Sequence, residues 1–180
     1  VEYAYIRVLH LSPDAPAVDI WVDDIGRAVE DLPFPEGTDY LELEAGTYTF
    51  RVLPAGADVG QSVLDIQDLP LMAEGRYTAV AYDELASITA MALEDNYADL
   101  ADGDIRVRAI HTAVGVGQVD IWNIPATGDP APLYENVDFG VAGAYLDLPA
   151  GAYTLGFDVD DDASPDVVFN VPELSAGTVA

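Results

Sequence analysis

The sequence has no cysteine and no lysine, and its six arginines face thirty-three acidic residues. Without cysteine, the chain can form no disulfide, thiolate-bound zinc site, iron–sulfur cluster or thiol nucleophile. A formal net charge of −27 excludes nucleic acid as a partner and disfavours an anionic membrane surface, because both are negatively charged themselves. No apolar run approaches the roughly 20 residues that a membrane-spanning helix needs, so we expect no transmembrane segment.

Hydrophobic residues are nonetheless plentiful, at 51% of the 180 residues. They suffice for a packed core in one large domain or in two domains of about 90 residues each. The excess of carboxylates is typical of an extracellular or salt-adapted protein, because acidic groups hold water and oppose association. A cation-binding role for some aspartates is the alternative explanation. If the protein is exported, its numbering starts after the site of signal-peptide cleavage.

Two blocks of sequence occur twice along the chain. LHLSPDAPAVDIW at 9–21 aligns without a gap with IHTAVGVGQVDIW at 110–122, and YLELEAGTYTF at 40–50 matches YLDLPAGAYTL at 145–155. Two ordered matches that share a Trp and a His predict a duplicated domain. The predicted organisation is a first domain at residues 1–95, a linker at 96–103 and a second domain at 104–180.

The local patterns are those of β-strands. Apolar residues alternate with a period of two in 6–10 and 18–23, and TYTFRV at 47–52 is rich in β-branched and aromatic residues. Turn signals with Gly and Pro recur every 8–12 residues or so, as in β-sandwiches. We therefore predict an all-β fold of two tandem antiparallel β-sandwich domains, immunoglobulin-like or transthyretin-like. The one helix candidate is 93–100, between the two copies, and we interpret it as linker rather than helix.

A resemblance to a known family rests on the first block. The pattern H-x-SPDAPAVDIWVDD at 10–24, followed by YLELEAGTYTFRV at 40–52, resembles the bacterial and archaeal family of the domain of unknown function 4397. The resemblance extends to both copies, although the second has AVGVG at 113–117 where the first has SPDAP. It implies an extracellular or cell-surface β-sandwich module, often found in tandem, and it brings no catalytic residues.

The two histidines occupy the same position in the two copies. His10 could join Asp14 and Asp19 in a metal or acid–base site. The second copy keeps His111 and Asp120 but has Ala and Gly where the first has Ser12 and Asp14. We therefore expect the retained residues to be structural, because a partly buried imidazole needs a hydrogen-bonding partner. These structural residues are His10, Asp19, His111 and Asp120.

Two further features could bind a ligand. Trp21 and Trp122 lie on the strand face opposite Ile20 and Ile121, where an indole either packs against protein or stacks on a sugar ring. The run DVDDDASPD at 158–166 has the alternate acidic spacing of a calcium loop, but it lacks the glycine and the final glutamate of an EF-hand. The candidate calcium ligands are Asp158, Asp160, Asp162 and Asp166. No other cofactor is expected.

The second copy is expected to lack its closing strands. The first copy continues past Gly75 through RYTAVAY and ITAMAL, whereas the glycine matched in the second copy, Gly177, lies three residues before Ala180. We expect an open edge near 167–171, which other protein chains can pair with. Either the chain is a fragment of a longer one, or another chain supplies the strands.

No pattern in the sequence indicates an enzyme. No serine lies in a G-x-S-x-G context, and carboxylate pairs are too frequent to single out a glycosidase site. We expect a non-enzymatic extracellular or cell-surface structural or interaction module, either alone or as one part of a larger surface assembly or filament. The alternative is a ligand-binding module for carbohydrate or calcium.

Overall fold

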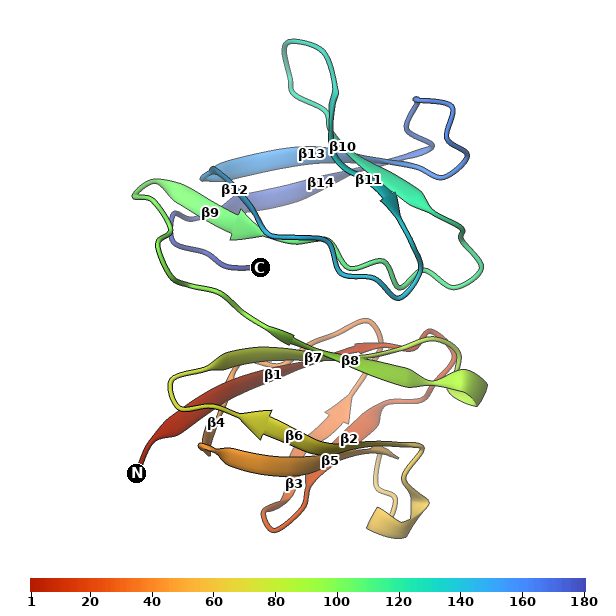
Figure 1. Ribbon diagram of the computed structural model, residues 1–180. Helices are drawn as coiled ribbons and strands as arrows, with labels where there is room; N and C mark the ends of the chain where they lie inside the picture. The colour runs from red at the N-terminus through yellow and green to blue at the C-terminus, as the bar shows by residue number, and fades with distance from the viewer. The chain divides into compact units, whose positions relative to one another are not determined.

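The protein is built almost entirely of β-strands. The computed structural model describes all 180 residues, and Figure 1 shows strands joined by turns and loops. Two short 3-10 turns, η1 (Val59–Gln61) and η2 (Leu85–Ser87), are its only helical segments. None of the helical segments has the length and apolar character that a membrane span requires. The predicted all-β class is confirmed. The one helix candidate, 93–100, contains no helix: its first two residues end a strand and the rest are non-helical.

The chain divides into two compact units, Val1–Asn96 and Tyr97–Ala180. The first unit has two four-stranded sheets, with strand orders β4–β1–β7–β8 and β3–β2–β5–β6. Neighbouring strands are antiparallel except β1 and β7, which run parallel. The strands are β1 (Tyr3–Leu11), β2 (Val18–Val22), β3 (Gly26–Leu32), β4 (Leu41–Glu44), β5 (Gly46–Pro54), β6 (Leu64–Leu71), β7 (Arg76–Tyr82) and β8 (Thr89–Glu94).

The core of the first unit lies between its two sheets. Alternation along β1 turns every second side chain inward, so that Ile6 is fully buried and Val8 is nearly so. Phe50 and Val52 of β5 face them from the other sheet and belong to the same buried cluster. Fully burying a side chain of this size contributes about 1.5–3 kcal/mol relative to leaving it exposed. The period-two pattern in the sequence therefore identifies the core face.

The second unit has six strands. They form a four-stranded sheet, β11–β10–β13–β14, and a two-stranded sheet, β12–β9. The strands are β9 (Asp104–Val107), β10 (Val119–Asn123), β11 (Ala131–Val137), β12 (Leu146–Pro149), β13 (Gly151–Asp158) and β14 (Val167–Leu174). Their pairing repeats the pairing of β1 to β6 in the same order, so that β9 corresponds to β1 and β14 to β6. Figure 1 shows β13 and β14 side by side as a long ribbon pair.

Residues 177–180 pair with β9 at an edge of the smaller sheet. Val179 forms an isolated parallel bridge with Arg106, and the N–H of Ala180 donates to the carbonyl of Arg106 over 2.9 Å. The N–H of Gly177 donates to the carbonyl of Asp104 in β9 over 2.8 Å. In the first unit, the N–H of Glu74 donates to the carbonyl of Tyr3 in β1 over 2.7 Å. Gly177 thus takes the place of Glu74, one residue away from the expected match with Gly75.

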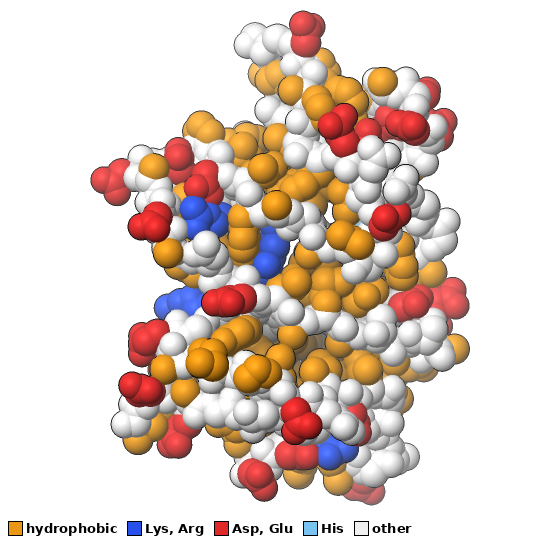
Figure 2. All heavy atoms as spheres, viewed as in Figure 1, with side chains coloured by type: hydrophobic (Ala, Val, Ile, Leu, Met, Phe, Trp, Pro, Cys, Tyr) orange, Lys and Arg blue, Asp and Glu red, His pale blue; other side chains and the backbone are white.

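Aspartates occupy most of the non-glycine positions with left-handed backbone. Six of the nine non-glycine residues with left-handed backbone are aspartates, among them Asp24 and Asp31. Asp and Asn tolerate this conformation because a short polar side chain can bond to the local backbone. Figure 2 shows acidic side chains scattered around the visible face, with few basic ones among them. Some of the aspartates that make the protein acidic therefore also have a structural role, because they adopt the left-handed backbone conformation.

Candidate functional site

Both histidines are buried at equivalent positions, His10 near the end of β1 and His111 four residues after the end of β9. His10 is fully buried, and its Nε2 lies 3.1 Å from the carbonyl oxygen of Pro16, while its Nδ1 accepts the N–H of Ser12. His111 makes the same pair of contacts, with the Gly117 carbonyl at 2.7 Å and the N–H of Ala113. Nε2 must carry the proton, because a carbonyl can only accept. Each imidazole therefore ties together the loop that follows it.

The aspartate on the next strand holds a different loop. Asp19 accepts hydrogen bonds from the N–H groups of Asp31 and Gly56, each at 2.7 Å, and it forms an ion pair with Arg27. Burial would raise the pKa of Asp19, but these two N–H donors and the guanidinium outweigh it and hold the pKa below its usual value. Asp19 therefore pairs with Arg27 and not with His10. His10 bonds to the backbone of the loop that follows it.

The matching aspartate in the second unit keeps only part of this arrangement. Asp120 accepts the N–H of Asn136 over 2.6 Å, the counterpart of the bond from Asp31 to Asp19. Strand β11 places Pro132 opposite Trp122, where β3 places Arg27 opposite Trp21. The second unit therefore has proline where the first has the guanidinium of Arg27. Asp120 keeps the hydrogen bond from the backbone of Asn136.

The two tryptophans are half-buried on the outer faces of β2 and β10. The buried indole nitrogen of Trp122 has no hydrogen-bonding partner. Beside it, Gly156 lies so close to Ile124 and Pro165 that a Cβ there would come within 2.8 Å of both side chains. A sugar stacks on an open ring face, and both rings here are half-covered by protein.

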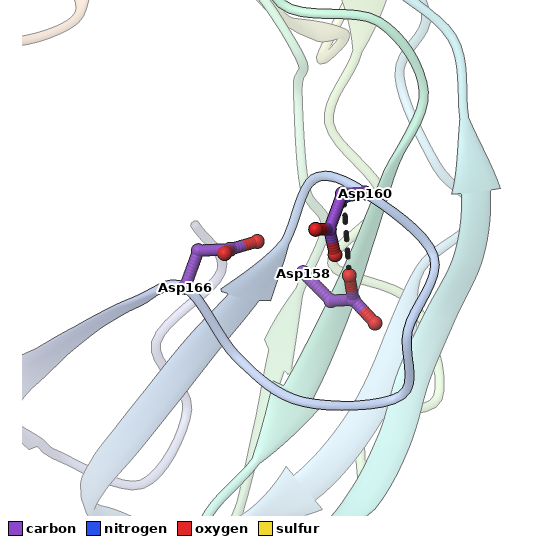
Figure 3. Close-up of side chains that lie close together, drawn as sticks. All are labelled: Asp158, Asp160 and Asp166. Atoms are coloured by element: carbon purple, nitrogen blue, oxygen red, sulfur yellow. Dashed lines mark hydrogen bonds between the residues drawn. The ribbon is translucent and has the colours of Figure 1, made fainter.

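Three of the four predicted calcium ligands lie together on the loop between β13 and β14. One carboxylate oxygen each from Asp158, Asp160 and Asp166 lies within 4.8 Å of the others, and Figure 3 shows the three side chains gathered at this loop. The remaining residue, Asp162, accepts the N–H of Ser164 at the loop tip instead. The loop is therefore a three-carboxylate cluster, smaller than the sequence predicts.

The buried member of this cluster organises the loop backbone. Asp158 is 2% exposed, and its carboxylate accepts N–H groups from Asp160, Asp161 and Ala163 at 3.3, 2.9 and 2.8 Å. It pairs across strands with Asp120, whereas the equivalent pair in the first unit is Asp19 with Leu53. An aspartate has thus replaced a buried leucine, and the loop supplies the hydrogen bonds that a buried carboxylate requires.

The exposed members of the cluster repel one another. The pKa of Asp160 is raised, chiefly by the negative charges of Asp162 and Asp166, with a smaller effect of burial. A raised pKa at a carboxylate marks a site of uncompensated negative potential. A divalent cation would relieve it, because three carboxylate oxygens at this spacing match part of an oxygen-only coordination shell.

A polar network in the first unit was not foreseen from the sequence. Asp95 is buried, and its carboxylate accepts the hydroxyl groups of Tyr40 and Thr78 at 2.6 and 2.7 Å. Arg7 bonds to Thr78 and lies 3.8 Å from Asp95. These residues are far apart in the sequence. The parallel pairing of β1 with β7 brings Arg7 to Thr78, and the pairing of β7 with β8 brings Asp95 beside them. No local motif could have identified them.

The inner face of the second unit is partly bare. The buried cluster of this unit contains only Val119, Ile121 and Val137. On β13, Leu155 and Phe157 are only half-buried, although their counterparts Phe50 and Val52 are each 2% exposed. On β14, Val167 and Phe169 are 54% and 37% exposed. We call the side chains of Leu155, Phe157, Val167 and Phe169 the bare face.

The comparisons with known proteins place the chain in a family. A family model described as Domain of unknown function (DUF4397) matches residues 4–122. The chain belongs to this family. The DUF4397 match spans all but the first three residues of the first unit and extends through most of β10 in the second unit.

No curated protein matches the chain. Among solved structures, the chain is similar to "The Bacillus anthracis TIE protein", at 15% sequence identity and a TM-score of 0.27. The similarity covers 97% of this chain and 32% of the TIE protein chain. This DUF4397 protein therefore spans about a third of the length of the TIE protein chain. A likeness of this size adds nothing to the fold or the function described above.

Proposed function

We propose that the chain is a non-enzymatic structural or interaction module of the extracellular space or the cell surface. It consists of two tandem copies of one β-sandwich domain, of immunoglobulin-like or transthyretin-like type. Residues 97–180 contain no counterparts of β7 and β8. We propose that strands in line with Val179 and Ala180, from a longer form of this chain or from another protein chain, cover the open edge of the second copy. A high density of carboxylates suits such a role, since it keeps a protein with an open edge soluble.

The observation that carries this proposal is the bare face. In the first unit, β7 and β8 extend the sheet of β1, and β8 contacts β6. In the second unit, β14 corresponds to β6, and its Val167 and Phe169 are exposed at that location. An apolar inner face without a cover is a surface for a partner. An edge strand with unpaired backbone groups is a template for pairing.

The matched contacts support the duplication. Both histidines bond to a carbonyl six residues further along the chain and to an N–H two residues further along. Asp19 and Asp120 both accept the N–H of a residue with left-handed backbone, Asp31 and Asn136, at φ 55° in each. Independent evolution of the same side-chain contacts on the same strands is improbable for unrelated domains.

The same contacts support a non-enzymatic role. Both ring nitrogens of His10 and of His111 are engaged by backbone groups. A general base needs a free lone pair within reach of its substrate. Asp19 is likewise committed to two N–H groups and to Arg27.

The incomplete-domain proposal is tested by completing the domain within the chain. Because Val179 and Ala180 take the places of Arg76 and Tyr77, residues 78–94 are appended directly after Ala180. We expect the melting temperature of the second unit to rise by several degrees, since a buried apolar face adds stability. The matched control is an extension with the same residues in scrambled order, which should add nothing. Equal melting temperatures for the two extensions would contradict the proposal.

The proposed location is tested separately. Antibodies raised against the chain should detect it in the medium or on washed, intact cells of the source organism. Detection in the cytosolic fraction alone would overturn an extracellular role.

Calcium binding is a second candidate function, favoured by the cluster of Asp158, Asp160 and Asp166. Calcium prefers oxygen ligands, and its binding would stabilise the folded loop in proportion to its affinity. At millimolar calcium, this function requires a rise in melting temperature that magnesium at equal ionic strength does not reproduce. Changing Asp160 and Asp166 to Asn should abolish the rise. Without such a difference between the two cations, the calcium function is refuted.

A further inference from the structure

We propose that the outer face of the sheet β11–β10–β13–β14 is a docking surface for a basic segment of a partner protein. The segment carries apolar side chains flanked by arginine or lysine. This surface is separate from the open edge and from the bare face, because it lies on the side of the sheet that is turned away from the core. It therefore does not depend on how the open edge is covered.

In the first unit, the row of outward residues that crosses the four-stranded sheet is charged. Trp21 of β2 lies between Arg27 of β3 and Arg51 of β5. Arg51 in turn lies opposite Asp65 of β6. Residues that lie opposite one another on paired strands project to the same face of the sheet. Both arginines are neutralised there, Arg27 by Asp19 and Arg51 by Asp65.

The equivalent row in the second unit carries no charge. Trp122 of β10 lies between Pro132 of β11 and Gly156 of β13. Gly156 in turn lies opposite Val168 of β14. Pro132 is exposed and Val168 is 56% exposed. Proline, glycine and valine therefore stand where the first unit has two arginines and an aspartate.

The glycine in this row lets neighbouring apolar side chains close over the strand. A Cβ at Gly156 would lie 2.6 Å from the Cβ of Pro165 and 2.8 Å from the Cδ1 of Ile124. Both side chains therefore lie against the outer face at this point. With the row itself they form an apolar surface that we call the outer patch, made of Trp122, Ile124, Pro132, Pro165 and Val168. Apolar side chains gathered on an outer sheet face mark a surface for a partner.

The loop that supplies Pro165 gives the outer patch an acidic border. Asp160, Asp161 and Asp162 of this loop are exposed. No arginine or lysine occurs from 109 to 180, the part of the chain that contains all four strands of this sheet. Complementary charges favour association. An apolar surface with an acidic border therefore fits a segment that is apolar and basic.

A second copy of the chain is a poor occupant of the outer patch. An isologous contact places the same surface of each copy against the other. It would bring two acidic loops together, and like charges repel. The partner is therefore a protein of opposite charge.

The test titrates the chain with two peptides of equal charge, Arg-Arg-Leu-Val-Leu-Arg-Arg and Arg-Arg-Ser-Thr-Ser-Arg-Arg. We expect the peptide with leucine and valine to bind one to one and to shift the amide resonances of Trp122 and Val168, and the other peptide to do neither. Val168→Ser should weaken binding by roughly fivefold or more, because less apolar surface is then buried. Val167→Ser is the matched control, since Val167 is 54% exposed on the opposite face of the same strand, and it should bind normally.

The acidic border is tested by a pair of double variants. Asp161→Asn with Asp162→Asn should weaken binding at low ionic strength, and the difference should shrink as salt screens the charges. Asp24→Asn with Asp68→Asn is the matched control, because it makes the same change in net charge at exposed residues of the first unit. It should leave the affinity unchanged.

Three results would overturn the inference. They are equal binding of the two peptides, equal losses from Val167→Ser and Val168→Ser, and equal losses from the two double variants. Self-association of the chain that Val168→Ser abolishes would identify a second copy as the occupant and would also overturn it. The comparison of the two peptides leaves the chain unaltered, so it decides the apolar contact even where a variant fails to fold.

Discussion

Each buried histidine joins the two ends of its own loop, and this arrangement recurs in both units. His10 also contacts the ring of Phe34 edge-on, as His111 contacts Phe139. The surrounding apolar contacts explain why the pKa of His10 is lowered, since burial disfavours the charged imidazolium more than the Pro16 carbonyl favours it. The ring is thus held neutral in the folded protein.

This neutrality predicts how stability changes with pH. The unfolded chain binds a proton at His10 near the ordinary pKa of 6.5, and the folded chain does so only at lower pH. Stability contributed by His10 is therefore present above pH 6.5 and is lost as the pH falls below it. His10→Ala should cost about 1–3 kcal/mol at pH 7.5, because it leaves backbone partners unpaired. The cost should shrink toward pH 5.5, as measured by urea unfolding at both values. A pH-independent difference would contradict this account.

The sequence indicates some of these residues and not their partners. The repeat of His and Asp in the two copies is enough to single out His10, Asp19, His111 and Asp120. The Pro16 and Gly117 carbonyls could not be foreseen, because loop conformation decides which backbone group an imidazole meets. Arg27 was also missed, since arginine on an exposed strand is common and its orientation toward Asp19 depends on the bulged pairing of β2 with β3.

At the scale of the strands and loops, the loop between β13 and β14 depends on one side chain. Asp158 accepts three backbone N–H groups, whereas Asp162 accepts one at the exposed tip. Asp158→Ala should therefore destabilise the second unit by about 1–3 kcal/mol. Asp162→Ala should stay within about 0.5 kcal/mol of the unaltered protein. Calorimetry of the two variants checks this, and equal stabilities would show that the loop does not depend on Asp158.

The elements themselves are largely predictable from the sequence. Alternating apolar residues locate β1 and β2, and the β-branched run at 47–52 lies inside β5. The acidic run at 158–166 is recognisable as a loop, but its first residue is a buried strand residue in the place of Leu53. Sequence reasoning failed there because aspartate is rarely buried, and only the three-dimensional path of the loop supplies its hydrogen bonds.

At the scale of the whole molecule, the two units differ in how much apolar surface they bury. The core cluster of the first unit contains fourteen buried residues, and that of the second contains three. We expect two unfolding transitions, the second unit unfolding at the lower temperature, because stability grows with buried apolar area. The variant Trp122→Phe leaves Trp21 as the only indole, so its fluorescence should follow the upper transition alone. A single transition seen by both calorimetry and fluorescence would refute this.

The overall charge makes stability depend on salt. Thirty-three acidic residues and six arginines in 180 residues repel one another in the compact state more than in the expanded one. Salt screens these charges over about 8 Å at physiological ionic strength. We expect the melting temperature to rise steadily with sodium chloride concentration. An unchanged or falling melting temperature would show that local pairs such as Arg51 with Asp23 and Asp65 dominate the electrostatics.

The aspartates with left-handed backbone restrict how this protein can be altered. At Asp24, Asp31, Asp68, Asp83, Asp99 and Asp161, the residue that supplies negative charge also adopts the left-handed backbone of a turn, a loop or a strand irregularity. Replacement by lysine or serine would remove the charge and strain the backbone together, whereas asparagine or glycine removes the charge alone. A less acidic version of this chain, whether evolved or engineered, therefore has to pass through asparagine and glycine at these positions, so that its acidity is tied to the path of its backbone.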